Sequence, residues 1–267
     1  MARRGRRTSA RNHCVVDLRA EPALDLARPR RLGELVEAAF SLFWRHRAVF
    51  LTVSLIVVAP AVILVDGVWG RALVNGVDAK EPSDAVAASR LLGTFVIPPL
   101  VTALHVRIVQ GLAQGRTPSV GDAVRAAGAR IMPAAGAVAL YALVVIGGTL
   151  LFVVPGVYVA VAMCFAAQSA VVDEARPAEA LRRSRDLVLG HWWWTAGRLI
   201  ALALISLLVA AVLGSVVGSV AAALGGAVLS VAALVVVEAI ALSIGALFGT
   251  LLFFDLRARR AGPPRPA

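Results

Sequence analysis

The hydrophobic positions of the chain fall into six long runs separated by short polar segments. The runs are Ala48–Val65, Leu91–Val109, Pro133–Val154, Gly156–Val172, Thr195–Val217 and Val228–Phe254. Each can cover about 30 Å of hydrocarbon if the helix tilts or extends slightly into the interface. Backbone polar groups cannot stay bare in lipid, so continuous apolar runs predict helices, whereas barrel strands would alternate. The pattern therefore predicts an all-α polytopic bundle of six transmembrane helices.

Three shorter segments show the spacing of amphipathic helices, with apolar residues on one face and charged residues on the other. They begin near Leu32, Val120 and Pro177, and each has an acidic residue close to its start: Glu34, Asp122 and Glu179. Two apolar runs follow each segment. This order predicts three parallel repeats, each an interfacial amphipathic helix plus a hairpin of two spans.

Composition and charge support a membrane location and give it an orientation. The chain is 59% hydrophobic and 16% charged, with a formal net charge of +11. Of its 27 basic residues, all but Arg71, Lys80 and Arg90 fall on one side of a six-span arrangement. Because positive loops stay inside, both termini are predicted in the cytoplasm. Nearly all the basic residues are Arg, which suggests a bacterial protein in the plasma (inner) membrane.

The chain divides into a membrane domain and two tails. Residues 1–29 are predicted to be a disordered basic cytoplasmic tail, 30–260 the six-span domain, and 261–267 a second disordered cytoplasmic tail. The N-terminal arginines do not form a signal peptide, because the first apolar stretch begins only near Ala48. Cys14 and Cys164 would lie in different compartments, so we predict no disulfide.

Several short motifs resemble a known family. Val153-Val154-Pro155-Gly156-Val157-Tyr158 is interpreted as a Pro-Gly turn between two spans, followed by Asp173-Glu174, Ala178–Ser184 and Gly190–Trp193. With Leu32–Leu35, this resembles bacterial and archaeal integral membrane proteins that include the membrane domain joined to some glycerophosphoryl diester phosphodiesterases. The resemblance covers about Arg30 to Arg260 and implies a six-span membrane domain without the soluble catalytic barrel.

Two titratable residues within the predicted spans are candidates for a ligand or proton site. Glu238 lies near the middle of the sixth run, where a charge is costly, and it shares a helical face with Ala241, Gly245 and Gly249. It is therefore expected to face the bundle interior, either as a functional site or as a protonated carboxyl bonded to a neighbouring helix. His105 in the second run either titrates or packs as a satisfied buried histidine.

Other residues point to the membrane interface. Trp44, Trp192, Trp193 and Trp194 are predicted interface anchors, since aromatic side chains favour the headgroup level. Arg182, Arg183 and Arg185 are predicted to contact lipid headgroups. The small-residue stripe Ala210, Gly214, Gly218 and Ala222 either packs the fifth run against the sixth or serves homo-oligomerisation or a membrane-protein partner.

No motif indicates chemistry. Lys80 is the only Lys, which excludes a P-loop, and there is no His pair with zinc spacing and no plausible Ser/His/Asp set. We therefore expect no cofactor, no metal, no nucleic acid and no enzyme activity. The favoured hypothesis is a non-enzymatic domain that organises anionic membrane lipids or partners through its inner-face helices. The alternatives are a small-molecule or lipid carrier with a polar site near Glu238, and an intramembrane enzyme.

Overall fold

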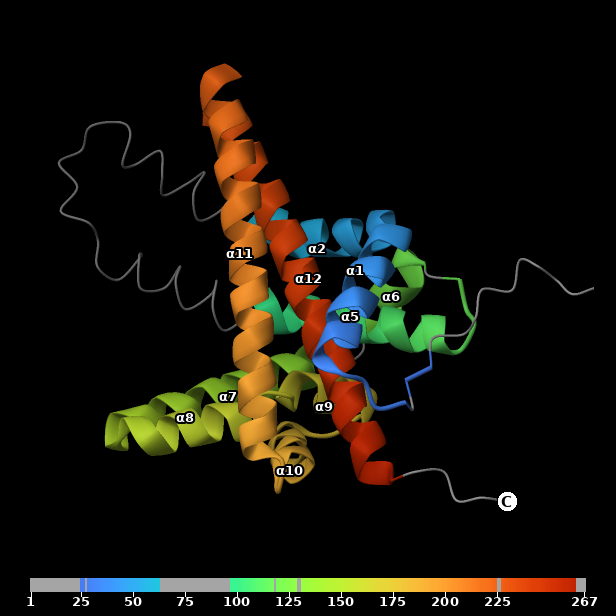
Figure 1. The fold of residues 1–267 in the computed structure, drawn as a ribbon, viewed down its shortest axis with the longest axis vertical. Coiled ribbons are helices and arrows are strands. Elements are labelled where there is room, and N and C mark those ends of the chain that lie inside the picture. Colours follow the sequence, from blue (N-terminus) through green and yellow to red (C-terminus); the bar gives the residue numbers. More distant parts are fainter. Residues whose placement is uncertain are drawn as a thin grey trace, which may run out of the picture.

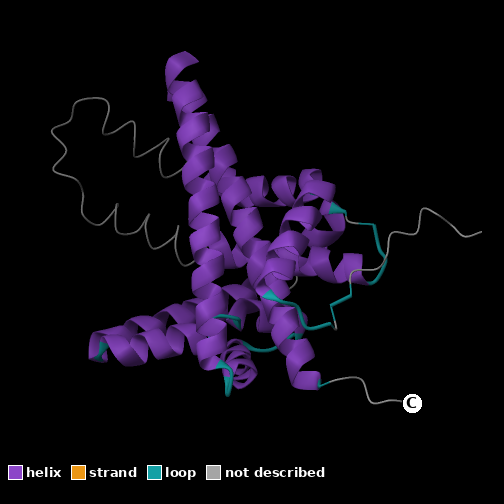
Figure 2. Cartoon of the chain, viewed as in Figure 1, coloured by secondary structure: helices purple, strands orange, loops and turns teal. Residues whose placement is uncertain are grey.

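A computed structural model describes residues 25–26, 28–62, 97–117, 119–128, 131–224 and 227–262. Throughout these ranges the regular secondary structure is helical (Figure 2). The helices, labelled as in Figure 1, are α1 (Leu32–Arg45), α2 (Arg47–Val62), α5 (Ile97–Ala113), α6 (Val120–Gly128), α7 (Ile131–Leu151), α8 (Val153–Ala162), α9 (Ala166–Val172), α10 (Pro177–Val188), α11 (Trp192–Leu224) and α12 (Ala227–Ala261).

The prediction of a helical membrane protein is confirmed at a coarse level. In the described ranges four stretches are long and apolar enough to cross a membrane: Met132–Leu151, Val153–Val172, Trp192–Ala221 and Val228–Ala261. A fifth results if α1 and α2, which bend by 88° at their junction, are taken as one span. The predicted first external loop and the start of the second run fall in 63–96, outside the described residues. Most of residues 1–29 and all of 263–267 lie outside them too.

The three short amphipathic helices form where the pattern predicts them, as α1, α6 and α10. Each has its acidic residue in the first turn. In α1 the carboxylate of Glu34 accepts a 3.2 Å hydrogen bond from the backbone N–H of Arg31, which satisfies a donor at the helix start. Pro177 begins α10, and Gly190, at φ 82°, follows its end.

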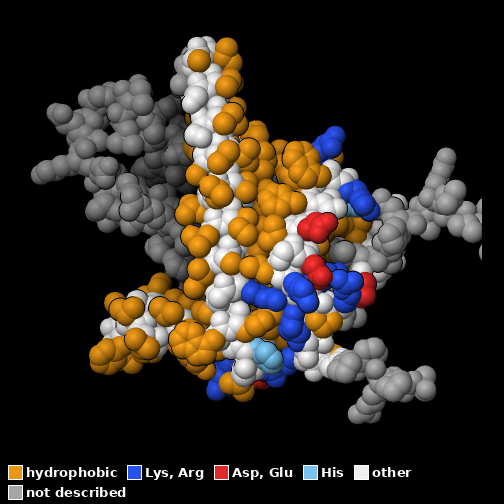
Figure 3. Space-filling view, in the orientation of Figure 1, with side chains coloured by type: hydrophobic (Ala, Val, Ile, Leu, Met, Phe, Trp, Pro, Cys, Tyr) orange, Lys and Arg blue, Asp and Glu red, His pale blue; other side chains and the backbone are white. Residues whose placement is uncertain are grey.

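The core lies where α12 meets α1, α2, α5 and α9. The rings of Phe40 and Phe248 meet edge to face at 5.9 Å, and those of Phe165 and Phe253 lie 5.8 Å apart. The long helices α11 and α12 run side by side, and the α7–α8 hairpin extends from their lower end in a different direction (Figure 1). Hydrophobic side chains cover α11 and that hairpin, whereas charged ones gather over α1 and the lower half of α12 (Figure 3).

The turn between α7 and α8 is not the predicted Pro-Gly turn. The break lies at Phe152, which is extended (φ −159°, ψ 146°), and Pro155 and Gly156 belong to the first turn of α8. Gly156 is needed for close approach instead. A Cβ there would lie 2.7 Å from Cα and 2.8 Å from N of Thr149. Tyr141 Oη also donates to the carbonyl of Ala160 at 3.1 Å, so the two helices are joined at both ends.

The fourth predicted span is divided into α8 and α9, and a side chain of α10 binds the backbone groups at the interruption. The hydroxyl of Ser184, which is fully buried, accepts from the N–H of Phe165 at 3.0 Å and donates to the carbonyl of Ala162 at 3.3 Å. These are backbone groups that a continuous helix would have paired internally. One side chain of an amphipathic helix therefore makes the interruption tolerable.

Replacing Gly156 with Ala should destabilise the α7–α8 hairpin, because the new methyl would meet the backbone of Thr149. We expect a loss of about 1–3 kcal/mol, typical of overpacking, measured by thermal unfolding in detergent. Gly147→Ala in α7 is the matched control, since nothing lies within 4 Å of a Cβ at that position. Equal stability of the two variants would contradict the close approach.

Candidate functional site

A buried carboxylate near the end of α12 accepts hydrogen bonds from three parts of the chain. Asp255, which is fully buried, accepts from Arg198 Nη1 at 3.1 Å and from Arg259 Nε at 3.0 Å. It also accepts from the backbone N–H of Arg30 at 2.5 Å. The carbonyl of Arg30 in turn accepts from Arg198 at 3.0 Å and from Arg259 at 2.8 Å. The two arginines thus bind a carboxylate and a carbonyl together.

An indole completes this charged cluster. The guanidinium carbon of Arg198 lies 3.7 Å from the ring centroid of Trp194, and that of Arg259 lies 4.5 Å from it. Cation–π contact adds attraction beyond the ion pairs and covers the arginines from solvent. The cluster fastens the start of α11, the end of α12 and the segment before α1 to one another.

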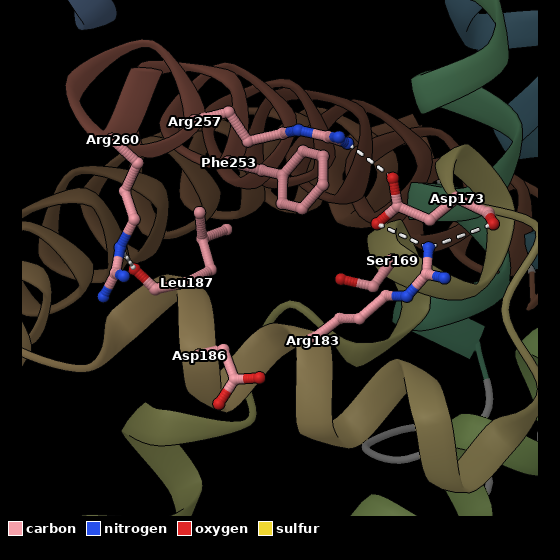
Figure 4. A pocket seen from close by; sticks show the side chains of 8 residues that line it. All are labelled: Ser169, Asp173, Arg183, Asp186, Leu187, Phe253, Arg257 and Arg260. Carbon is pink, nitrogen blue, oxygen red and sulfur yellow. Dashed lines mark hydrogen bonds and ion pairs between the residues drawn. The ribbon is translucent and has the colours of Figure 1, made fainter. Parts of the chain in front are cut away.

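A second charged cluster lines a pocket of about 310 Å³ between α9, α10 and the last turns of α12 (Figure 4). Asp173, just after α9, receives Arg257 Nη1 at 2.8 Å and has Arg183 Nη1 at 3.9 Å. Arg183 also donates to the backbone carbonyl of Asp173 at 3.2 Å and pairs with Glu179. Arg260 donates to backbone carbonyls at the end of α10, those of Leu187 and Leu189.

His105 is fully buried and packs within the bundle. Its ring stacks on Phe50 at 5.0 Å, and its Nδ1 lies 2.8 Å from the carbonyl of Val101. The other ring nitrogen, Nε2, has no partner within the described part of the chain. Nearby in the fold, the hydroxyls of Ser54 and Ser243 are 2.7 Å apart, and Ser243 reaches the Phe50 carbonyl at 3.4 Å. This is a small polar contact among α2, α5 and α12.

Glu238 does not face the bundle interior, so that expectation is wrong. Its side chain is exposed, and among its neighbours Val237 and Ala239 are the buried ones. The small residues expected on its face do contact helices: a Cβ at Gly245 would lie 3.8 Å from Ser206 Oγ, and one at Gly249 3.4 Å from Gln168 Nε2. Glu238 also lies about 26 Å along α12 from Asp255, because 17 residues separate the two at about 1.5 Å each.

The predicted interface residues divide into two groups. Trp44 and Trp193 are 62% and 84% exposed, and their ring contacts are with residues next to them in sequence, Phe43 and Trp192. Trp192 and Trp194 make protein contacts instead: Trp192 stacks on Tyr158 at 5.7 Å and donates its Nε1–H to the Tyr158 carbonyl at 3.0 Å. All three arginines of α10 are exposed, but only Arg183 is also held at the pocket by Asp173.

Sequence reasoning missed Asp255, and it noted Asp173 only as part of a family-like motif and not as a site residue. Asp255 stands at the end of the run Leu251–Phe254, among residues interpreted only as the basic end of the last span. The available signal was an acid directly after a long apolar run. Its partners Arg30 and Arg198 are far away in sequence, so helical spacing could not reveal the pairing.

Comparisons with family models, curated proteins and solved structures find no match to this chain. The family resemblance of the sequence motifs therefore stays a prediction. Within the described residues, no group of three or more His, Cys, Asp or Glu side chains is placed to hold a metal ion.

Asp255→Asn should weaken the contacts that join the start of α11, the end of α12 and the segment before α1. Removing one partner of a buried ion pair leaves the other charges uncompensated, which typically costs about 3–5 kcal/mol. We expect a lower midpoint of thermal unfolding in detergent and faster proteolysis near Arg30. Glu37→Gln, at an exposed position of α1, is the control. If both variants unfold like the original protein, the cluster does not stabilise the fold.

Proposed function

We propose that this chain is a non-enzymatic, multi-pass membrane protein that gathers anionic lipid headgroups at its cytoplasmic face. The observation that carries the proposal is the outward face of α10. Arg182 and Arg185 are exposed there, and neither has a hydrogen-bond or ion-pair partner among the described residues. Arginine at the end of an apolar span attracts anionic headgroups, at about 1 kcal/mol per residue.

The proposed topology has six spans in three repeats, with both termini in the cytoplasm of a bacterial plasma membrane. Supporting it are the order of α1, α6 and α10, each directly before an apolar helix, and the basic residues concentrated at one end of the predicted spans. The motif resemblance to membrane domains of the phosphodiesterase-linked family supports the same layout. Under this topology the Asp255 cluster and α10 lie at the inner boundary.

A carrier function is the second candidate. Its site would be the buried contact around His105 rather than Glu238, because one ring nitrogen of His105 has no partner among the described residues while Glu238 is exposed.

Reporter fusions test the orientation. A reporter placed after Ala267 should report cytoplasm, and one inserted near Asp78 should report the outer side, because positive loops are retained inside. Alkaline phosphatase and green fluorescent protein activities in intact bacteria give opposite signals for the two compartments. The reverse pattern would overturn the orientation and the assignment of α10 to the inner face.

Removing the charges of α10 should weaken binding of anionic lipid. The double change Arg182→Ala/Arg185→Ala is expected to lower affinity for phosphatidylglycerol by about 30-fold, from about 1 kcal/mol per arginine. Native mass spectrometry of detergent-solubilised protein, with phosphatidylcholine for comparison, measures the retained lipid. The charge-matched control is Arg71→Ala/Arg90→Ala, on the predicted external side. An equal loss in both variants would contradict a site on α10.

A further inference from the structure

The pocket between α9, α10 and α12 carries the strongest further inference. Side chains from three helices and the segment after α9 converge on it (Figure 4). Its lining consists of Ser169, Asp173, Arg183, Asp186, Leu187, Phe253, Arg257 and Arg260. It lies at the same end of α12 as the Asp255 cluster, but its residues differ from those of that cluster and from the outward arginines of α10.

The arginines of the pocket are held in place by contacts that leave some of their N–H donors unoccupied. Arg257 and Arg183 are both oriented by Asp173, and Arg260 is oriented by backbone carbonyls of Leu187 and Leu189. A guanidinium carries more N–H donors than these bonds occupy. The remaining donors are pre-positioned, so a bound oxyanion would not have to order flexible side chains.

Ser169 adds a polar group that lacks a partner. Its side chain is only 1% exposed, its hydroxyl points into the pocket in Figure 4, and it makes no side-chain hydrogen bond among the described residues. The oxygen opens onto the pocket and is not sealed inside the protein, so water can reach it when no ligand is bound. A ligand oxygen in the pocket would supply the missing partner.

The acidic residues of the pocket favour a ligand that carries a positive group beside its oxyanion. Asp186 lines the pocket from α10 and has no partner among the described side chains. Together with Asp173 it offsets two of the three arginines that line the pocket, which leaves the lining with a formal net charge of +1. A phosphate alone would leave Asp186 without a partner, whereas a ligand that carries both a phosphate and an ammonium group offers a partner to the arginines and to Asp186.

We propose that this pocket binds a phosphate ester with a neighbouring primary ammonium group, the chemistry of a phosphoethanolamine headgroup. The phosphate oxygens accept from a free donor of Arg257 and from the Ser169 hydroxyl, while Arg260 stays bound to the backbone carbonyls at the far side of the pocket. The ammonium group donates to Asp186. This headgroup differs from the anionic lipid proposed for the outward face of α10, and the two sites are tested by different residues.

The full-length protein in detergent, with short-chain phosphatidylethanolamine and the matched phosphatidylglycerol as probes, provides the test. Microscale thermophoresis should show phosphatidylethanolamine bound about tenfold more tightly, from one charge-assisted hydrogen bond. Asp186→Asn should abolish this preference without weakening phosphatidylglycerol, and Ser169→Ala should weaken both lipids. Arg182→Ala/Arg185→Ala should keep the preference even while it weakens anionic lipid binding overall. Thermal unfolding of each variant confirms that it folds.

Two further probes identify the source of the headgroup. If soluble O-phosphoethanolamine competes as strongly as the lipid, the result supports a soluble ligand of this chemistry. If only the lipid competes, the result supports a membrane ligand. Inorganic phosphate should compete poorly, since it has no group for Asp186. A preference that survives Asp186→Asn, or stronger competition by inorganic phosphate than by O-phosphoethanolamine, would overturn the proposal.

Discussion

The buried carboxylate of Asp255 is the interaction on which the arrangement of the helices depends. It holds the start of α11 through Arg198, the end of α12 through Arg259, and the chain before α1 through the backbone of Arg30. A carboxylate without bulk water needs several donors, and here two cations and an amide supply them. The pocket and the outward face of α10 depend on it indirectly, because α12 contributes Phe253, Arg257 and Arg260 to the pocket.

Periodicity predicted the elements well because it reflects local physics. The spacing of apolar residues located α1, α6 and α10, and the long runs located α7, α11 and α12. The details it missed depend on approach between segments. Pro155 and Gly156 suggested a turn, yet Gly156 is there because α8 packs on the backbone of Thr149. The sequence around Glu238 predicted that this residue faces inward. Whether that face is buried depends on how α11 packs along α12, and this contact is not encoded in the local pattern.

The sequence revealed only part of the candidate site, again because the missing part depends on contacts between distant segments. The arginines of α10 were noticed as a group, but the sequence could not separate Arg183, which pairs with Asp173 and Glu179, from Arg182 and Arg185, which have no ion-pair partner among the described residues. On a helix, a shift of one position turns a side chain by about 100° and changes its surroundings completely. Which arginine meets a carboxylate is set by α9 and α12, and those contacts join residues distant in sequence.

The contact of Ser184 with the break between α8 and α9 limits how α10 can respond to an occupant. Sliding α10 away would leave the N–H of Phe165 and the carbonyl of Ala162 unpaired at a buried position. A headgroup that engages α10 therefore cannot easily displace it. Its binding would instead reduce how often the break opens, and this would appear as slower amide hydrogen exchange at Phe165 rather than as a shifted helix.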